Sequence, residues 1–402
     1  MNSLLFILFF SIIDCSIVAF ATRNANNKPK VSPLKDGSIF NNNKDDDWIE
    51  APVLHIPSML SPKKSTSNSI IKLLSTEIVK SKIKKSISKS HVHRYELEEE
   101  IKSILNASPS GSYTIVYGPK GVGKTESILY TAIGKDAVIN LWVDSATSVN
   151  DILTTLSKRL FGIDIVSLVG TEALIELIEA CNVIPTIIFD VELGCSPDYV
   201  SGLLAVKCLA KRLAHTCRCI IVLSEPSDII LFRQYGDRYV EHYLYVDEPT
   251  YDEAKALLQH TNINVQLTDT EMEYLFNTLG TNPQMFNHMC SFVGTGERTL
   301  REYIDDRLAH AEQELVAFPH KAILKALKEH PEGVPPKYFY NQYSNGINLS
   351  DPTAVGAAMK RSNVMVYRRE LGLYTLMSTP YKTALRSYTP RVPGEGGSMG
   401  WA

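Results

Sequence analysis

The sequence of 402 residues predicts an α/β fold built on a parallel sheet, followed by a helical region and by a small domain of helices and a hairpin. Three observations lead to this prediction. Apolar strands alternate with helices over residues 91–248, which is typical of a parallel sheet covered on both faces. Residues 249–312 contain only helical patterns. In residues 313–390, two strands joined by a turn near Glu370 follow two or three helices.

The alternation begins with a predicted helix at residues 95–106 and a strand at residues 112–117. The strands are apolar along their whole length, as expected for strands buried on both faces. The other predicted strands are residues 137–144, 185–190, 219–224 and 243–246. The other predicted helices of the core are residues 127–133, 148–162, 171–182 and 203–216. Ser148 and Asn150 are both suited to begin the second of these helices.

The helical region and the C-terminal domain follow in order along the chain. The expected helices of the first are residues 250–260, 268–280, 283–293 and 297–315. The C-terminal domain should contain helices within residues 320–340, a hairpin at 364–378 and a helix at 381–388. Helices followed by a β-hairpin suit a winged-helix fold. The tail, residues 391–402, is rich in glycine and is expected to be disordered.

The first 90 residues predict a leader and a linker. Residues 1–21 are largely apolar and end in a small-residue junction, which indicates a signal peptide, with an uncleaved signal anchor as the alternative. Residues 22–90 have the Asn-, Lys- and Ser-rich composition of a linker or transit segment and include a predicted basic amphipathic helix at 69–90. Such a pair resembles the two-part leaders of proteins sent to complex plastids. Ordinary secretory entry, with a secreted or endomembrane location, is the alternative. No later run has the roughly 18 apolar residues that a membrane span needs.

The net charge of −3 conceals an uneven distribution. Residues 1–90 contain 13 basic and 7 acidic residues, a net charge of +6. Residues 91–320 contain 17 and 32, a net charge of −15, and residues 321–391 contain 11 and 4, a net charge of +7. The acidic middle gives no reason to expect nucleic acid there. The basic C-terminal segment either contacts nucleic acid or packs on the acidic core.

One short stretch carries a specific chemical signal. Residues 118–125 match the pattern G-x-x-x-x-G-K-T between a predicted strand and a predicted helix. Glycines let backbone N–H groups turn inward around phosphates, and the N-terminus of the helix adds positive potential. Lys124 can reach the outer phosphates, and the Thr125 hydroxyl can ligate Mg²⁺. The residues of this P-loop expected to bind nucleotide are Gly118, Pro119, Lys120, Gly121, Val122, Gly123, Lys124, Thr125 and Glu126.

A second acid for the metal follows a later strand. Asp190 ends the predicted strand at residues 185–190. Open α/β sheets bind ligands beyond the carboxyl ends of their strands, so Asp190 is expected to lie near Thr125 and to help hold Mg²⁺. The alternative is an ordinary turn residue at the end of a strand.

The P-loop, the acid strand and the order of elements resemble the AAA+ and STAND branch of P-loop ATPases, including the archaeal-type ATPases. The resemblance implies a core of the ASCE/AAA+ type that takes ATP, and no guanine-reading N-K-x-D follows the core. In that branch a Glu directly follows the Asp and orients the attacking water. Here the sequence reads Asp190-Val191-Glu192, so the Glu comes one place later. If the strand continues, Asp190 and Glu192 share a face and Glu192 can take this role, although slow hydrolysis is expected.

Further positions match the catalytic pattern of this branch. Ser224, at the end of the third core strand, matches the polar sensor 1 residue that contacts the γ-phosphate or the water. Arg233 and Arg238 lie in the region that supplies an arginine finger, and the sequence does not choose between them.

Two softer matches concern the borders of the nucleotide site. Residues 94–97, Arg-Tyr-Glu-Leu, resemble the R-x-E-L that opens archaeal-type STAND ATPases. Residues 280–283 resemble the Gly-x-Pro of the helical lid, with one extra residue, and Pro283 is expected near the adenine. No sensor 2 arginine stands beside Pro283, which speaks against a ring-forming remodelling protein.

The leading hypothesis is an ATP-binding and ATP-hydrolysing switch, in which Mg·ATP closes the core against the lid. One alternative is a DNA- or RNA-binding ATPase that uses residues 321–391, where Lys360, Arg361, Arg368 and Arg369 lie near the hairpin. The other is a non-hydrolysing nucleotide-binding interaction protein, because Glu192 is displaced. A protein partner is expected, but the sequence identifies neither it nor the oligomeric state.

Overall fold

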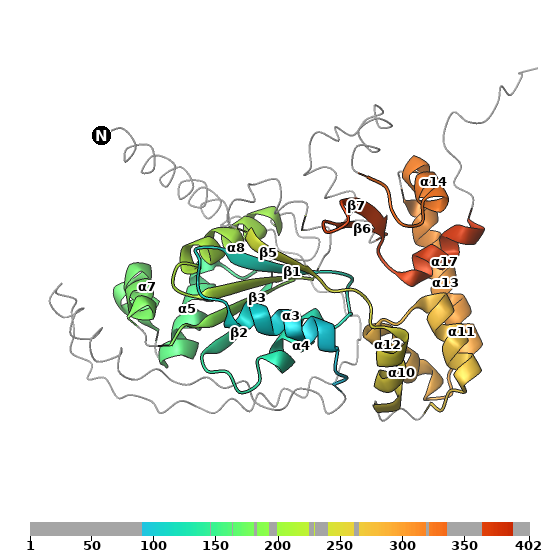
Figure 1. Cartoon of the computed structure of the whole chain (residues 1–402), viewed down its shortest axis with the longest axis horizontal. Coiled ribbons are helices and arrows are strands. Elements are labelled where there is room, and N and C mark those ends of the chain that lie inside the picture. The colour runs from blue at the N-terminus through green and yellow to red at the C-terminus, as the bar shows by residue number, and fades with distance from the viewer. Residues whose placement is uncertain are drawn as a thin grey trace, which may run out of the picture.

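The computed structural model describes residues 91–144, 146–162, 164–180, 183–192, 199–224, 229, 240–260, 265–318, 321–335 and 364–388. The predicted leader, the predicted linker with its expected amphipathic helix and the C-terminal tail lie outside these ranges. Figure 1 shows an α/β core beside a group of helices that ends in a small hairpin and a last helix, both coloured red. Among the described residues, no helix combines the length and the apolar composition that crossing a bilayer requires.

The core is a parallel sheet of five strands in the order β2-β3-β4-β1-β5. One strand, β4, therefore separates β1, which leads into the P-loop, from β3, which carries Asp190. This order confirms the predicted α/β core of the ASCE/AAA+ type. The strands are β1 (Tyr113–Tyr117), β2 (Val138–Asp144), β3 (Thr186–Glu192), β4 (Arg218–Leu223) and β5 (Val240–Tyr245).

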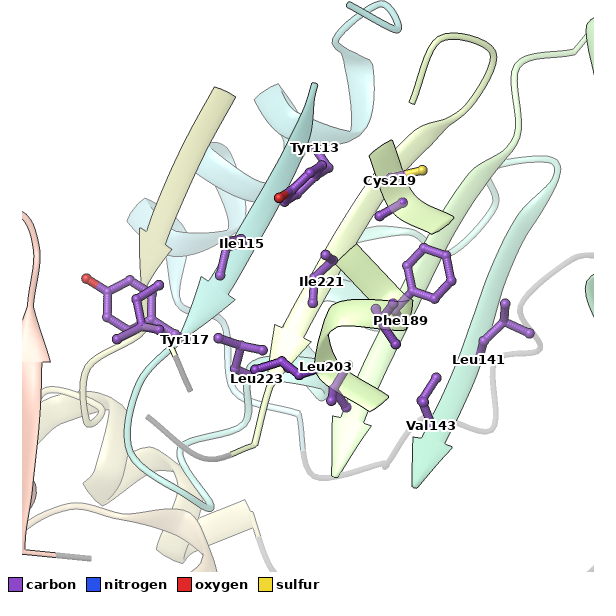
Figure 2. Packing of buried hydrophobic residues seen from close by; sticks show 14 of the residues in the cluster. Tyr113, Ile115, Tyr117, Leu141, Val143, Phe189, Leu203, Cys219, Ile221 and Leu223 are labelled. Atoms are coloured by element: carbon purple, nitrogen blue, oxygen red, sulfur yellow. The ribbon is translucent and has the colours of Figure 1, made fainter. Parts of the chain in front are cut away.

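Helices cover both faces of this sheet. Alternate residues of β1 point to opposite faces, so Ile115 packs on one side and Val116 on the other, each in its own apolar cluster. The face with Ile115 is filled by large side chains such as Phe189 and Leu223 (Figure 2). Burying one such side chain contributes roughly 1.5–3 kcal/mol. The helices of the core are α3 (Tyr95–Asn106), α4 (Lys124–Thr131), α5 (Val149–Phe161), α6 (Ile165–Val169), α7 (Thr171–Glu179) and α8 (Tyr199–Leu213).

Local capping decides where the second helix after the P-loop begins. The Ser148 side chain accepts a hydrogen bond from the Asp151 amide, and the Asp151 carboxylate accepts one from the Ser148 amide. This reciprocal pair makes Ser148, rather than Asn150, the N-cap of α5. Helix α6 is not predicted by the periodicity, because five residues are too short for a helical repeat to show.

Four further helices form a separate layer, which we call the lid, with its own apolar cluster. Two of them begin with capping boxes, Thr268 with Glu271 and Thr299 with Glu302. The last helix packs Tyr303 in the lid cluster and Leu315 in the core cluster, so the boundary predicted at residue 312 falls inside one continuous helix. The lid helices are α10 (Tyr251–His260), α11 (Asp269–Leu279), α12 (Pro283–Val293) and α13 (Leu300–Ala317).

The C-terminal part contains the expected helix, hairpin and last helix. Strands β6 and β7 pair in antiparallel fashion, and Val334 forms a bridge to Tyr374 of β7. Residues 336–363 lie outside the described ranges, so the complete winged helix stays a prediction. The elements are α14 (Lys321–Glu329), β6 (Met365–Arg368), β7 (Leu373–Leu376) and α17 (Thr379–Ser387).

The basic turn of this hairpin rests on the edge of the core sheet. The Arg368 guanidinium lies 4.2 Å from the ring centroid of Tyr245, and that of Arg369 lies 3.5 Å from Tyr243. Arg368 also forms an ion pair with Asp247 at 3.1 Å. Two arginines of the basic segment therefore pack on the core, as the second of the two alternatives expected from the charges requires.

A second contact joins the hairpin to the strand before the P-loop. The Tyr117 hydroxyl donates a hydrogen bond to the Glu370 carboxylate at 2.9 Å and accepts one from the Arg369 amide at 3.0 Å. Burial raises the pKa of Tyr117, so the hydroxyl stays protonated and available as the donor. Tyr117 directly precedes Gly118, the first residue of the P-loop. The hairpin is therefore hydrogen-bonded to the residue next to the P-loop.

Candidate nucleotide-binding site

A cavity of about 680 Å³ opens between the core and the lid. Its walls come from the P-loop and the start of α4, from the ends of β3 and β4, and from α10 and α12 of the lid. The volume suits a small-molecule ligand such as a nucleotide. Of the residues predicted from the sequence, those lining the cavity are Lys120, Gly121, Val122, Gly123, Lys124, Thr125, Glu126, Glu192, Ser224 and Pro283.

The glycines of the P-loop are required by the backbone path. Gly118 has a φ of 148°, and a Cβ on it would lie 2.1 Å from the Val246 carbonyl oxygen. Gly123 has a φ of 86° at the N-cap of α4, where a Cβ would meet nothing within 4 Å. The space beside Gly123 leaves the loop open to a bound group. The positive φ of Gly123 still favours glycine at this position.

Backbone donors of the loop are available to an anion. Among the described residues, the N–H groups of Gly121 and Gly123 donate no hydrogen bond to another part of the chain. Helix α4 starts at Lys124, so its first N–H groups also lack partners within the helix. The loop and the helix N-terminus thus present convergent donors and a positive dipole end, which is the arrangement that binds phosphate.

Lys124 is held inside the loop. Its ammonium donates hydrogen bonds to the carbonyl oxygens of Gly118 at 3.0 Å and Pro119 at 2.9 Å, and the residue is only 7% exposed. Gly118 and Pro119, which do not line the cavity, therefore orient the lysine that does. A bound phosphate would be a charged partner for this ammonium within the same loop.

Thr125 and Asp190 meet as the sequence predicts. The Thr125 hydroxyl donates a hydrogen bond of 2.9 Å to the Asp190 carboxylate, although 65 positions separate the two residues. Burial raises the pKa of Asp190, and the Thr125 hydrogen bond and the nearby Lys124 charge act in the opposite direction. A hydroxyl and a half-buried carboxylate side by side are hard oxygen ligands of the kind that Mg²⁺ prefers.

Strand β3 continues through Glu192, so Asp190 and Glu192 lie on one face, as expected for an extended strand. The Glu192 carboxylate forms an ion pair with Lys120 of the P-loop at 3.1 Å, and both side chains are about half exposed. Ser224 lines the same cavity, and its amide bonds to the Val191 carbonyl at 3.1 Å. The displaced Glu is therefore at the site, paired with a loop lysine.

Arg94 is a site residue whose role the sequence reasoning missed. Its guanidinium donates to the carbonyl oxygens of Val122 at 3.2 Å and Asp247 at 2.9 Å. It also forms an ion pair with Glu253 of α10 at 3.5 Å. One side chain thus joins the P-loop, the segment after β5 and the lid. The R-x-E-L resemblance pointed to this position but not to these partners.

The lid contacts the P-loop through a residue that was not predicted. The Asn282 amide donates a hydrogen bond of 2.8 Å to the Lys120 carbonyl, and its oxygen accepts one from the Gln284 amide. A Cβ on Gly121 would lie 2.4 Å from the side chain of Gln284. Pro283, predicted to lie near the adenine, is at the first turn of α12 in the cavity wall. The only sequence signal for Asn282 was its place in the Gly-to-Pro stretch.

Glu126 occupies the first turn of α4 with an unusual environment. Burial raises the pKa of its carboxyl, and the neighbouring His91 acts in the opposite direction. Its Oε1 atom is buried with no hydrogen-bond partner among the described residues. An acid here is electrostatically compatible with a helix N-terminus. Arg233 and Arg238, the two predicted arginine fingers, lie outside the described residues.

No protein-family model matches the chain, and no curated protein sequence matches it. The chain is similar to the solved structure of Aeropyrum pernix ORC2 in ADPNP–ADP complexes, with 14% identity, 77% of this chain and 96% of that chain covered, and a TM-score of 0.41. The chain is also similar to Aeropyrum pernix ORC1 in complex with DNA, with 13% identity, 75% of this chain and 94% of that chain covered, and a TM-score of 0.39. The FIGL-1 AAA domain in complex with ADP is similar with 12% identity, 59% of this chain and 81% of that chain covered, and a TM-score of 0.37. At this level of similarity, binding and activity have to be argued from the residues of the chain itself.

Proposed function

We propose that the chain is an ATP-binding and ATP-hydrolysing P-loop protein that works as a slow nucleotide switch. The observation that carries the proposal is the 2.9 Å contact between Thr125 and Asp190 at the end of a P-loop with available amide donors. The Thr125 hydroxyl, Lys124 and the start of α4 line one cavity, and the Asp190 carboxylate is joined to them by its hydrogen bond to Thr125. Together these groups match the charges of a metal-bound triphosphate.

Each residue then has a defined task. The loop amides and Lys124 bind and orient the phosphates, and Thr125 and Asp190 are the residues that would hold Mg²⁺. Bound Mg·ATP supplies the phosphoanhydride bond and the divalent charge that offsets the negative phosphates. Ser224 lies where a polar side chain can contact the γ-phosphate or a water.

Glu192 is the residue that we assign to orienting the attacking water. It lies two residues beyond Asp190 on the same strand face and lines the cavity. To act as a base it must separate from Lys120, with which it forms an ion pair in the structure. Because this ion pair has to break before hydrolysis, we expect slow turnover of ATP, while ATP binding does not require the separation.

We expect Glu192→Gln to lower the turnover number about 100-fold, as for loss of a general base, with ATP affinity changed by less than about threefold. The amide keeps the size of the side chain but cannot accept a proton. Single-turnover hydrolysis and calorimetric ATP titration measure the two quantities. Glu172→Gln is the matched control, because Glu172 is another exposed carboxylate of the core in an ion pair, with Arg212. Equal turnover in wild type and Glu192→Gln would remove Glu192 from this role.

The switch is proposed from the position of the cavity. Glu253, Pro283 and Gln284 of the lid line it opposite the P-loop. Arg94 bridges the loop and the lid by a hydrogen bond to Val122 and an ion pair with Glu253. Asn282 does so by its hydrogen bond to Lys120. A ligand that contacts both walls favours the closed arrangement by its difference in affinity for the two states. The Tyr117–Glu370 contact extends this coupling to the C-terminal hairpin.

The nucleic-acid alternative has less support. Arg368 and Arg369, the two described arginines of the hairpin, lie on Tyr245 and Tyr243 of the core rather than on a free surface. The other two basic residues, Lys360 and Arg361, lie outside the described residues. The non-hydrolysing alternative shares ATP binding with the main proposal, and one measurement distinguishes the two.

That measurement is Mg·ATP binding followed by single-turnover hydrolysis on the purified chain. Saturable binding with slow phosphate release supports the switch. Binding without release supports the non-hydrolysing interaction protein. Absence of Mg·ATP binding would overturn the proposal.

A further inference from the structure

Two imidazoles and one carboxylate converge at the start of α3. The Nε2 atom of His91 lies 3.1 Å from Oε1 of Glu98, and Nδ1 of His93 lies 3.2 Å from Oε2. All three potential ligand atoms lie within 4.8 Å of one another. The side chains of His91 and Glu98 are 8% and 6% exposed, whereas that of His93 is 49% exposed. We propose that His91, His93 and Glu98 form a zinc-binding site.

The distances suit the ion. Tetrahedral zinc with Zn–N bonds of about 2.0–2.1 Å places neighbouring ligand atoms about 3.3 Å apart. The two histidine–carboxylate distances, 3.1 and 3.2 Å, are close to this value, although they end on the two different oxygens of Glu98. One shared oxygen requires a small movement of the carboxylate or of the His93 side chain, which is 49% exposed.

The donor set also suits the ion. Two histidines and a glutamate are a known zinc-binding combination, which leaves a fourth position for water. The neutral imidazole of a histidine is the form that ligates a metal ion. In the absence of metal the same three side chains form ordinary hydrogen bonds with one another. Their polar atoms therefore have partners both with and without a bound ion.

Neighbouring groups hold the ligands in place. The Arg94 amide donates a hydrogen bond of 3.1 Å to Oε1 of Glu98. The Tyr130 ring of α4 stacks on His91, with ring centroids 3.4 Å apart, and its hydroxyl lies 3.4 Å from Nε2 of His93. Such outer contacts fix the orientation of metal ligands. Zinc would therefore connect the segment before Arg94 to α3 through Glu98. His91 also lines the neighbouring cavity, but zinc binding does not depend on the proposed nucleotide function.

The test uses the purified full chain, stripped with a chelator and titrated with Zn²⁺ against a chromogenic competitor. Wild type should bind one zinc ion more tightly than His93→Ala, by more than the ~10–100-fold that loss of an outer-shell contact costs. His91→Ala should weaken binding in the same way. Co²⁺ in place of zinc should give visible d–d absorption in wild type that is absent from both variants.

The matched control is His242→Ala. His242 forms a similar hydrogen bond, 2.9 Å, with Glu100 of the same helix, but no third ligand joins it among the described residues. This variant should bind zinc as wild type does. Because the His93 side chain is half exposed, His93→Ala should melt at the wild-type temperature in the presence of chelator. This variant therefore tests the zinc site even if His91→Ala does not fold. Equal zinc affinity in wild type and His93→Ala would overturn the site.

Discussion

Lys124→Ala is expected to lower the affinity for Mg·ATP about 100-fold. Hydrogen bonds to charged groups contribute roughly 1.5–3 kcal/mol each, and about 2.7 kcal/mol corresponds to this factor. Lys124 is the one P-loop side chain whose charge is held by two loop carbonyls inside the phosphate-binding loop. Alanine removes the only ammonium in that position and leaves the loop amides, so residual weak binding should remain. Calorimetric titration with Mg·ATP measures the change.

The control separates a loss of charge from a loss of fold. The ammonium of Lys124 also satisfies the carbonyls of Gly118 and Pro119, so alanine could disturb the loop. Lys135→Ala, which removes a lysine whose hydrogen bond to Asn106 is exposed, should keep wild-type affinity. A thermal melt of each variant without nucleotide checks the fold. Wild-type ATP affinity in a folded Lys124→Ala protein would contradict the phosphate-binding role of the loop.

Asp190→Asn is expected to lower Mg²⁺-dependent turnover about 100-fold or more, the scale seen when a preorganised electrostatic group is lost from a catalytic site. Asparagine can still accept the hydrogen bond from Thr125, so the local geometry is retained. It cannot supply the negative charge that a divalent cation requires. A Mg²⁺ titration of single-turnover hydrolysis at saturating ATP measures the effect, and affinity for metal-free ATP should change little.

The stability of this variant gives an independent check. Burial raises the pKa of Asp190 in the folded protein above its ordinary value. At neutral pH the ionised carboxylate therefore costs folding free energy relative to the unfolded chain, and this cost disappears as the pH falls through the raised pKa. Asp190→Asn removes the charge, so the metal-free protein should melt at or above the wild-type temperature near pH 7. A large fall in melting temperature would show that Asp190 has a structural role instead.

Much of the site could be predicted because its signals are local or lie at strand ends. The P-loop is read from eight successive residues, and Asp190 follows from the rule that ligands bind at the carboxyl ends of parallel strands. Glu192 was placed by the period-two alternation of an extended strand, and β3 does continue far enough. The ion pair between Glu192 and Lys120 was not predictable, because it depends on how the loop folds over the strand end.

Other parts of the prediction depended on packing that no local pattern encodes. The basic C-terminal segment was compatible with nucleic acid or with the core, and the tyrosines of β5 that face Arg368 and Arg369 decide the contact. The predicted boundary at residue 312 fell inside α13 because this one continuous helix contributes to two apolar clusters in turn. The two candidate arginine fingers and the complete winged helix remain predictions.

By itself, the sequence determined the P-loop and the elements of the core and lid other than α6, although it left two candidates, Ser148 and Asn150, for the N-cap of α5. These depend on residues within a few positions of one another, whose hydrogen bonds and periodicity act before any distant contact forms. Only the tertiary structure decided that Lys120 pairs with Glu192, that Arg94 and Asn282 join the loop to the lid, and that two histidines and Glu98 converge. The first depends on how the loop folds over the strand end, and the second depends on the packing of the lid across the core. The third depends on how the segment before α3 folds back, because a side chain meets a partner only where the backbone brings both to one place.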